Sequence, residues 1–429
     1  MFTGSNNAAV VKNTTHKVVL PFYLYAALSF LAGTLFLFFS VTAFTQHYFH
    51  PHTLAITHIM ALGWGTMIIL GACHQLLPVM AEGSLYSVRL AYSSFFLAAV
   101  GIPLLVYGCY FFDMGWPAKW GGRFVLLSVL CFVLNATGSI KKGNSGNVHV
   151  VFILTASFWL FITAFLGLAL VYNFQYPFLH KTSLAYLPLH AHTGIVGWFL
   201  LLVMGVGSRL IPMFLISKYT NKKLLWGIYF FINSGLISFL IQFLFSHHSG
   251  FFPVSVSLVL AGIFLFGYYC LNCYRHRIRK KMDAQMKISL LSVLLMLVPV
   301  ILLIIVSGWL LDERMNERMV LMYGFVIFFG WITAIIFGMT FKTLPFIVWN
   351  KVYHQRAGLS KTPNPKDLFH HRAFYVMLLL YLSGFILFIT GIYYAEPLLL
   401  KVATLLLVLA AVLYNFNVIK VLLHKPGQA

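Results

Sequence analysis

The stretch His58-Ile-Met-Ala-Leu-Gly63-Trp64 has two further copies along the chain, which read His192-Thr-Gly-Ile-Val-Gly197-Trp198 and Phe325-Val-Ile-Phe-Phe-Gly330-Trp331. In every copy the Gly-Trp pair is followed, at the same intervals, by a glycine and then by a proline. The copies are almost evenly spaced, and self-similarity at a regular spacing predicts a fold built from similar units. A histidine opens the first two copies and a phenylalanine opens the third. The units are therefore expected to share an architecture, whereas a histidine site is expected only in the first two.

The composition of the chain is that of a membrane protein. Hydrophobic residues make up 61% and charged residues 9% of its 429 residues, and its mean hydropathy is +0.89. A soluble domain of this composition would expose far too much apolar surface to water. A helix of about 20 apolar residues crosses the hydrocarbon core of a bilayer, and such runs can be read at 18–46, 53–80, 87–111, 120–141, 148–173, 187–214, 223–246, 251–274, 287–311, 319–348, 369–392 and 396–422.

These runs predict an all-α membrane protein whose twelve transmembrane helices form three pseudo-repeated arcs of four helices. The repeats are expected at roughly 18–141, 148–274 and 287–422, within one polytopic domain that covers residues 1–429. The lipid bilayer is therefore an expected partner of the protein. Nothing along the chain suggests a separate soluble domain.

The net charge of +21 reflects membrane topology rather than nucleic-acid binding. Basic residues crowd alternate loops, among them Lys141 and Lys142, the segment 275–287 and the segment 342–372. Cytoplasmic loops carry such an excess of Lys and Arg. We therefore expect a multi-pass protein of a bacterial-type inner (cytoplasmic) membrane with both termini in the cytoplasm, and no nucleic-acid partner.

Acidic residues are scarce. All eight of them fall in predicted loops or at helix ends. Ion-coupled transporters and pumps usually need a carboxylate inside the membrane, so these functions are disfavoured. The chain also has no phosphate-binding glycine loop and no Ser/His/Asp set that would indicate hydrolysis.

Histidines near the starts of spans two and six are the candidate site. His58 and His192 occupy matching repeat positions, and we expect their imidazoles to face one another across a pocket and to hold one haem iron, because neutral imidazole is a common iron and copper ligand. His190 is turned by roughly 200° from His192 on a helix, so that one helix can serve two pockets. The alternative is that each is a hydrogen-bonded interfacial histidine.

Two further sets of residues are candidates. The adjacent His247 and His248 close span seven and are positioned to hold copper if they fold back toward His190, although a solvated loop is the other interpretation. Gly63 and Gly197 permit close approach of a flat cofactor or, alternatively, of a neighbouring helix backbone.

The twelve spans in three arcs, the early histidine of span two, and the segment His190-Ala-His192-Thr-Gly-Ile-Val-Gly-Trp198 resemble subunit I of the haem–copper oxidases and nitric-oxide reductases. The NnrS-type haem- and copper-containing membrane proteins, which are tied to nitric-oxide tolerance, are a close alternative. In the haem–copper family the His-x-His motif belongs to span ten, whereas span ten of this chain has no histidine.

The resemblance implies a haem-dependent membrane oxidoreductase that acts on O₂ or NO. His58 and His192 would be the axial ligands of a low-spin haem b, and His190 would be the catalytic, proximal ligand of a second haem. Electrons would come from a quinol or a cytochrome, with a small cytochrome subunit as a further partner. A non-enzymatic haem or copper protein for nitric-oxide response or metal handling is the second hypothesis, and a membrane transporter is the third.

Overall fold

The computed structural model describes residues 16–142, 146–245, 252–307, 313–356 and 362–426. Within these ranges twelve helical spans are long and apolar enough to cross a membrane, which confirms the all-α membrane fold. The helices are α1 (His16–Phe39), η1 (Val41–Thr45), α2 (Pro51–His58), η2 (Ile59–Thr66), α3 (Met67–Met80), α4 (Val88–Tyr110), α5 (Trp116–Lys141), α6 (Val148–Gln175), α7 (Leu187–His192), η3 (Thr193–Leu200), α8 (Leu201–Leu215), α9 (Lys222–Phe245), α10 (Phe252–Arg275), α11 (Ala284–Leu295), α12 (Leu297–Ser307), α13 (Glu313–Phe325), η5 (Val326–Ile332), α14 (Thr333–Tyr353), η6 (His354–Arg356), η7 (Pro365–Leu368), α15 (His371–Tyr394) and α16 (Pro397–Leu422).

The helix boundaries follow local sequence signals. Ser87 and Asp283 cap α4 and α11 by accepting hydrogen bonds from the backbone N–H groups of Leu90 and Met286. The predicted first span, 18–46, is too long, because α1 ends at Phe39 and a short 3₁₀ helix, η1, follows. Ser and β-branched residues begin at position 40, and both disfavour continuation of an α-helix.

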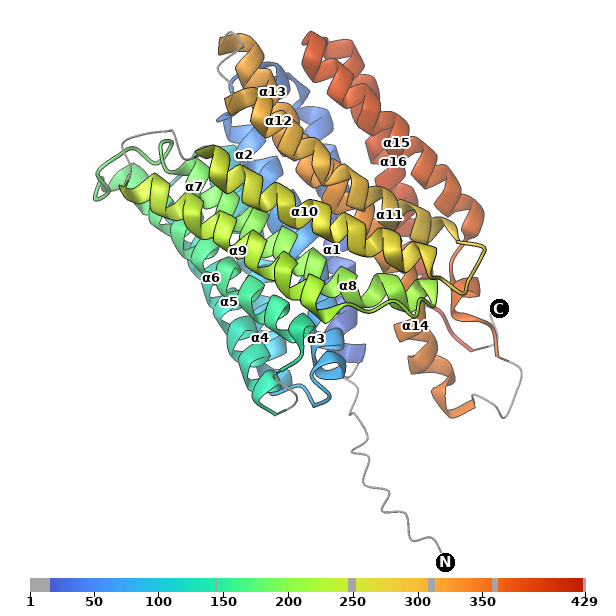
Figure 1. The fold of residues 1–429 in the computed structure, drawn as a ribbon. Coiled ribbons are helices and arrows are strands. Elements are labelled where there is room, and N and C mark those ends of the chain that lie inside the picture. The colour runs from blue at the N-terminus through green and yellow to red at the C-terminus, as the bar shows by residue number, and fades with distance from the viewer. Residues whose placement is uncertain (1–15, 143–145, 246–251, 308–312, 357–361, 427–429) are drawn as a thin grey trace, which may run out of the picture.

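The bundle consists of three units of four spans, which are α1–α5, α6–α10 and α11–α16. Within each unit the last two spans pack tightly together, as α4 with α5, α9 with α10 and α15 with α16. Figure 1 shows the α9–α10 pair across the front of the bundle and the α15–α16 pair along one edge. Between units, α5 packs against α6 and α16 packs against α1, whereas α10 makes few contacts with α11 and α12. The contact between the second and third units is therefore the loosest of the three.

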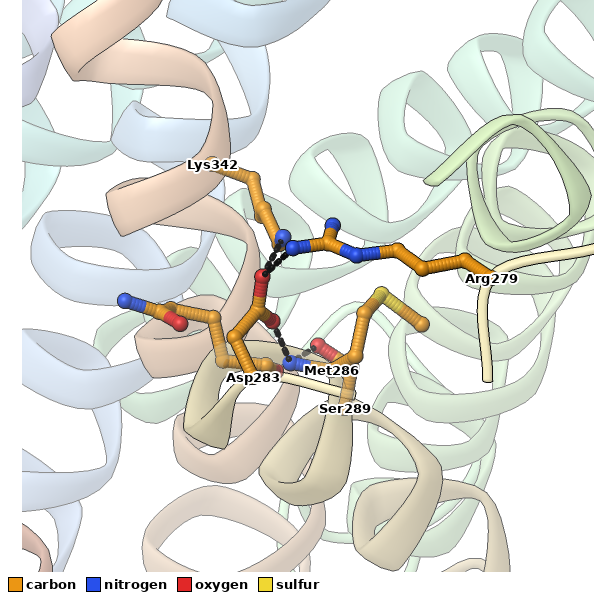
Figure 2. Close-up of polar contacts among 6 residues, drawn as sticks. Arg279, Asp283, Met286, Ser289 and Lys342 are labelled. Atoms are coloured by element: carbon orange, nitrogen blue, oxygen red, sulfur yellow. Dashed lines mark hydrogen bonds and ion pairs between the residues drawn. The ribbon is translucent and has the colours of Figure 1, made fainter. Parts of the chain in front are cut away.

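A partly buried ion pair ties α11 to α14 at the end of the bundle where α14 terminates. The carboxylate of Asp283 accepts a hydrogen bond from Lys342 Nζ and lies 3.3 Å from Arg279 Nη2, and Figure 2 shows both cations converging on it. Burial by itself would raise the pKa of the Asp283 carboxyl. The hydrogen bond and charge of Lys342, the Met286 N–H and the charge of Arg279 outweigh burial and hold the pKa below its ordinary value.

Replacing Asp283 by Asn removes this charge but keeps a capping oxygen for α11, so we expect a loss of stability of about 1–3 kcal/mol. Because the folded pKa is lowered, the stabilisation is present above the unfolded pKa of about 3.9 and is lost as the pH falls through the folded value. Thermal unfolding of the purified protein at neutral and acidic pH measures both effects.

The matched control is the double variant Asp283→Asn/Lys342→Met. It should be more stable than Asp283→Asn alone, since it leaves no unpaired, partly buried ammonium. Equal melting temperatures for wild type and Asp283→Asn at neutral pH would show that the ion pair contributes nothing to stability.

Candidate functional site

The three copies of the Gly-Trp motif lie on the three spans that are most buried in the bundle, Pro51–Met80, Leu187–Leu215 and Met315–Tyr353. In each of these spans the motif forms a stretch of π-helix, which is η2, η3 or η5. Such wide turns within an α-helix are rare and frequently mark functional sites. The helical period of the sequence does not reveal them, since it predicts only that these segments are helical and apolar.

A large cavity lies between the first and second units. Its volume is about 200 Å³, and both His58 and His190 line it. Its wall is otherwise largely apolar and includes several small residues, namely Ala61, Gly122, Ala164, Gly167, Ala191 and Gly194. We call this space the first cavity.

His58 and His190 face one another in the first cavity. Their ring centroids are 6.4 Å apart and the ring planes are inclined by 22°. His58 Nδ1 donates a hydrogen bond to the Leu54 carbonyl oxygen at 2.8 Å, and His190 Nδ1 donates one to the Thr163 carbonyl oxygen at 3.1 Å. Both bonds fix the tautomer in which the neutral ring keeps the Nε2 lone pair, the form in which histidine binds metals.

The expected pairing of His58 with His192 is wrong. His192 turns to the opposite side of its helix, where its Nε2 accepts a hydrogen bond from the Tyr323 hydroxyl at 3.2 Å and its Nδ1 donates one to the Pro188 carbonyl oxygen at 2.7 Å. The prediction that one helix serves two pockets is correct, because His190 and His192 line different cavities. His58 and His192 are equivalent positions of the repeat. When units are related by rotation, equivalent residues face successive interfaces between units, so they do not face one another.

The second cavity, which His192 lines, lies between the second and third units. Its volume is about 70 Å³, and its wall comes from α7, η3, α9, α10, α12, α13 and η5. Its polar side chains are His192, Ser255, Tyr323 and Trp331, and the remaining lining residues are apolar. Ile195 lines both cavities, so a single helix separates them.

The interface between the third and first units has no histidine at the equivalent position. Phe325 stands there and stacks on Phe329, Phe385 and Phe388 at centroid distances of 4.8, 5.7 and 4.1 Å. All four rings belong to the third unit, and Phe388 also contacts Phe44 of the first unit at 5.2 Å. The three interfaces therefore present, in turn, a His–His pair, a His–Tyr pair and an aromatic cluster.

Deeper in the bundle, tryptophans link the units through their indole N–H groups. Trp198 Nε1 donates to Thr66 Oγ1, and Trp64 Nε1 donates to Thr333 Oγ1, each at 3.0 Å. The same register would place the acceptor for Trp331 at position 200, but that residue is leucine. Trp331 is buried, and its Nε1 has no hydrogen-bond partner.

Gly63 and Gly197 are not on the wall of the first cavity. A Cβ atom at Gly63 would lie 2.8 Å from Ser29 Oγ, and one at Gly197 would lie 2.6 Å from Trp159 Cγ. Both glycines therefore permit helix packing, which was the alternative interpretation. The glycines that do line the cavity are Gly122, Gly167 and Gly194, and a Cβ at Gly167 would come within 2.8 Å of His190 Cε1.

His247 and His248, the predicted copper ligands, lie outside the described residues. Within the described ranges, no three or more His, Cys, Asp or Glu side chains gather into a metal-binding group. The candidate site is therefore the two-histidine first cavity. Its sequence gives no relative from which a role can be transferred, because no protein-family model matches the chain and no curated protein matches it.

Proposed function

We propose that this integral membrane protein binds one haem in the first cavity, where His58 and His190 would hold it, and that it functions in electron transfer. The observation that carries the proposal is the 6.4 Å separation of the two ring centroids. A bond from metal to imidazole nitrogen is about 2 Å long, so two rings that ligate one ion from opposite sides have centroids about 6 Å apart.

The surroundings of the two rings also suit a flat, largely apolar cofactor. The cavity of about 200 Å³ is bordered by the small residues Ala61, Ala164 and Gly167. The Nδ1 hydrogen bonds to Leu54 and Thr163 hold each ring in a fixed orientation and make it a stronger ligand.

Two cations of α5 lie near Gly122 in the sequence and would suit the carboxylates of haem propionates. Arg123 follows Gly122, which lines the cavity, and donates a hydrogen bond to the Tyr172 hydroxyl. Lys119, one turn earlier on α5, bonds to Gln175 Oε1. Among the described residues neither cation forms an ion pair with a carboxylate, and both contact the Tyr172 ring.

A haem held by two imidazoles supplies reversible one-electron transfer. With both histidines as ligands, such a haem would transfer electrons rather than bind O₂ or NO. Electron transfer is therefore the function that the geometry favours over the predicted catalytic role of His190. Turnover of O₂ or NO with a chemical reductant is the assay for the predicted enzymatic activity.

The charge distribution supports an orientation for the site. Lys141, Lys142, Lys222 and Lys223 belong to the end of the bundle that also holds Asp283, and a basic end is expected on the cytoplasmic side. His58 and His190 then lie near the outer side of a bacterial-type inner membrane. A quinol in the bilayer or a cytochrome at that surface would be the electron donor.

The visible spectrum of the purified protein tests the proposal. We expect sharp reduced-minus-oxidised haem bands and about one haem per chain after extraction. A colourless protein from haem-replete cells would contradict haem binding and would shift the assignment toward transport. Two haems per chain would contradict a single site formed by His58 and His190.

A further inference from the structure

The polar groups of the second cavity differ from those of the first. At one end His192 Nε2 accepts a hydrogen bond from Tyr323 at 3.2 Å, so the two groups are in direct contact and leave no space for a metal ion between them. Toward the other end Trp331 lacks the acceptor that Trp64 and Trp198 have. Both Trp331 and Leu200, the residue at the acceptor position, line this cavity.

An unpaired N–H group in an apolar interior is costly, and each such group in a folded protein calls for an explanation. Thr occupies the acceptor position in the first and third units, at Thr66 and Thr333. Leu200 in the second unit therefore leaves one donor free for a molecule that brings its own acceptor oxygen. No charged side chain lines the cavity, so that molecule is neutral.

The cavity reaches the lipid-facing surface of the protein. Phe239, Val256 and Leu303 line it and are partly exposed. They lie on α9, α10 and α12, and α10 and α12 make few contacts with one another. Because these helices are membrane spans, the opening faces the bilayer, and the ligand enters from the lipid phase.

We propose that the second cavity binds the ring of a lipid-soluble quinone or quinol. Such a molecule is neutral and dissolves in the bilayer. Its ring oxygens can accept a hydrogen bond from Trp331 Nε1 and exchange hydrogen bonds with the His192–Tyr323 pair. Ile195 separates the bound ring from the first cavity, so a bound quinol is well placed to donate electrons to a haem there. This role as an electron donor rests on the proposed function, whereas quinone binding does not.

Leu200→Thr is the decisive variant, and Leu200→Val is its matched control, since Val has the shape of Thr without the hydroxyl group. In Leu200→Thr the new hydroxyl accepts the Trp331 N–H and completes the pattern seen at Thr66 and Thr333. We expect decylubiquinone to bind wild-type protein in phosphatidylcholine nanodiscs saturably. Leu200→Thr should bind it about fivefold more weakly than Leu200→Val does, the effect of one lost hydrogen bond.

Three results would overturn the proposal. They are the absence of saturable quinone binding by the wild type, equal dissociation constants for Leu200→Thr and Leu200→Val, and a tightly held phospholipid in native mass spectra of the wild type that Leu200→Thr loses. The last result would assign the acceptor to a lipid ester. Trp331→Phe provides a second variant and should weaken binding to the same extent as Leu200→Thr.

Quinone binding and haem binding are tested separately. His58→Ala should lack haem and yet bind decylubiquinone with the wild-type dissociation constant. If His58→Ala retains both ligands, the haem proposal fails and the quinone proposal stands. If the wild type contains haem but binds no quinone, only the quinone proposal fails.

Discussion

His58→Ala and His190→Ala should each reduce the haem content of the purified protein at least about tenfold, whereas His192→Ala should retain the wild-type content. The physical reason is that His58 and His190 face one another with ring centroids 6.4 Å apart, while the His192 imidazole is directed to Tyr323 in another cavity. Haem extraction, normalised to the amount of folded protein in size-exclusion chromatography, measures the effect.

His192→Ala is a demanding control because it alters the same helix only two positions from His190. If it lost as much haem as His58→Ala, the pairing predicted from repeat register would be restored. If all three variants kept the haem, the ligands would lie elsewhere in the chain.

Gly121→Ala is expected to destabilise the protein by about 3 kcal/mol or more, at the upper end of overpacking effects. A Cβ atom at Gly121 would lie 2.3 Å from the backbone nitrogen and 2.8 Å from the Cα atom of Leu105, and 2.9 Å from the Gly101 carbonyl oxygen. These are backbone atoms that no side-chain rotation can move, so α4 and α5 would have to separate.

Gly267→Ala is the matched control. It also places a methyl group within a helix, but a Cβ there has no atom within 4 Å. It should be neutral or should stabilise α10 by about 0.5–1 kcal/mol, because Ala restricts the unfolded chain more than Gly does. Thermal unfolding in one detergent compares the two variants, and equal melting temperatures would contradict a rigid contact between α4 and α5.

The positions of His190 and His192 could be predicted from the sequence only in part. The period of an α-helix is enough to place His190 and His192 on opposite faces, and the structure has them in separate cavities. The partner of each histidine depends on which helix faces meet across an interface. That choice results from packing over whole spans, which one sequence does not specify.

The roles of the glycines could likewise be predicted only in part from the sequence. The motif glycines Gly63 and Gly197 are conspicuous in the repeat, yet they serve helix contacts. Gly122 and Gly167, which border the first cavity, belong to no repeated motif and have no local signal that distinguishes them. Only the positions of α5 and α6 beside the histidine pair give these two glycines a role.

The amino-acid sequence is enough to establish the class of the fold, because apolar runs long enough to span a bilayer have few stable alternatives to transmembrane helices. It also determined the threefold repetition of the Gly-Trp motif and the presence of histidine in two copies. The tertiary structure alone decided that His58 meets His190, that His192 meets Tyr323, and that Trp331 has no acceptor. These are contacts between spans far apart in the chain, and their geometry depends on π-helical turns and on close helix packing that local sequence preferences do not encode.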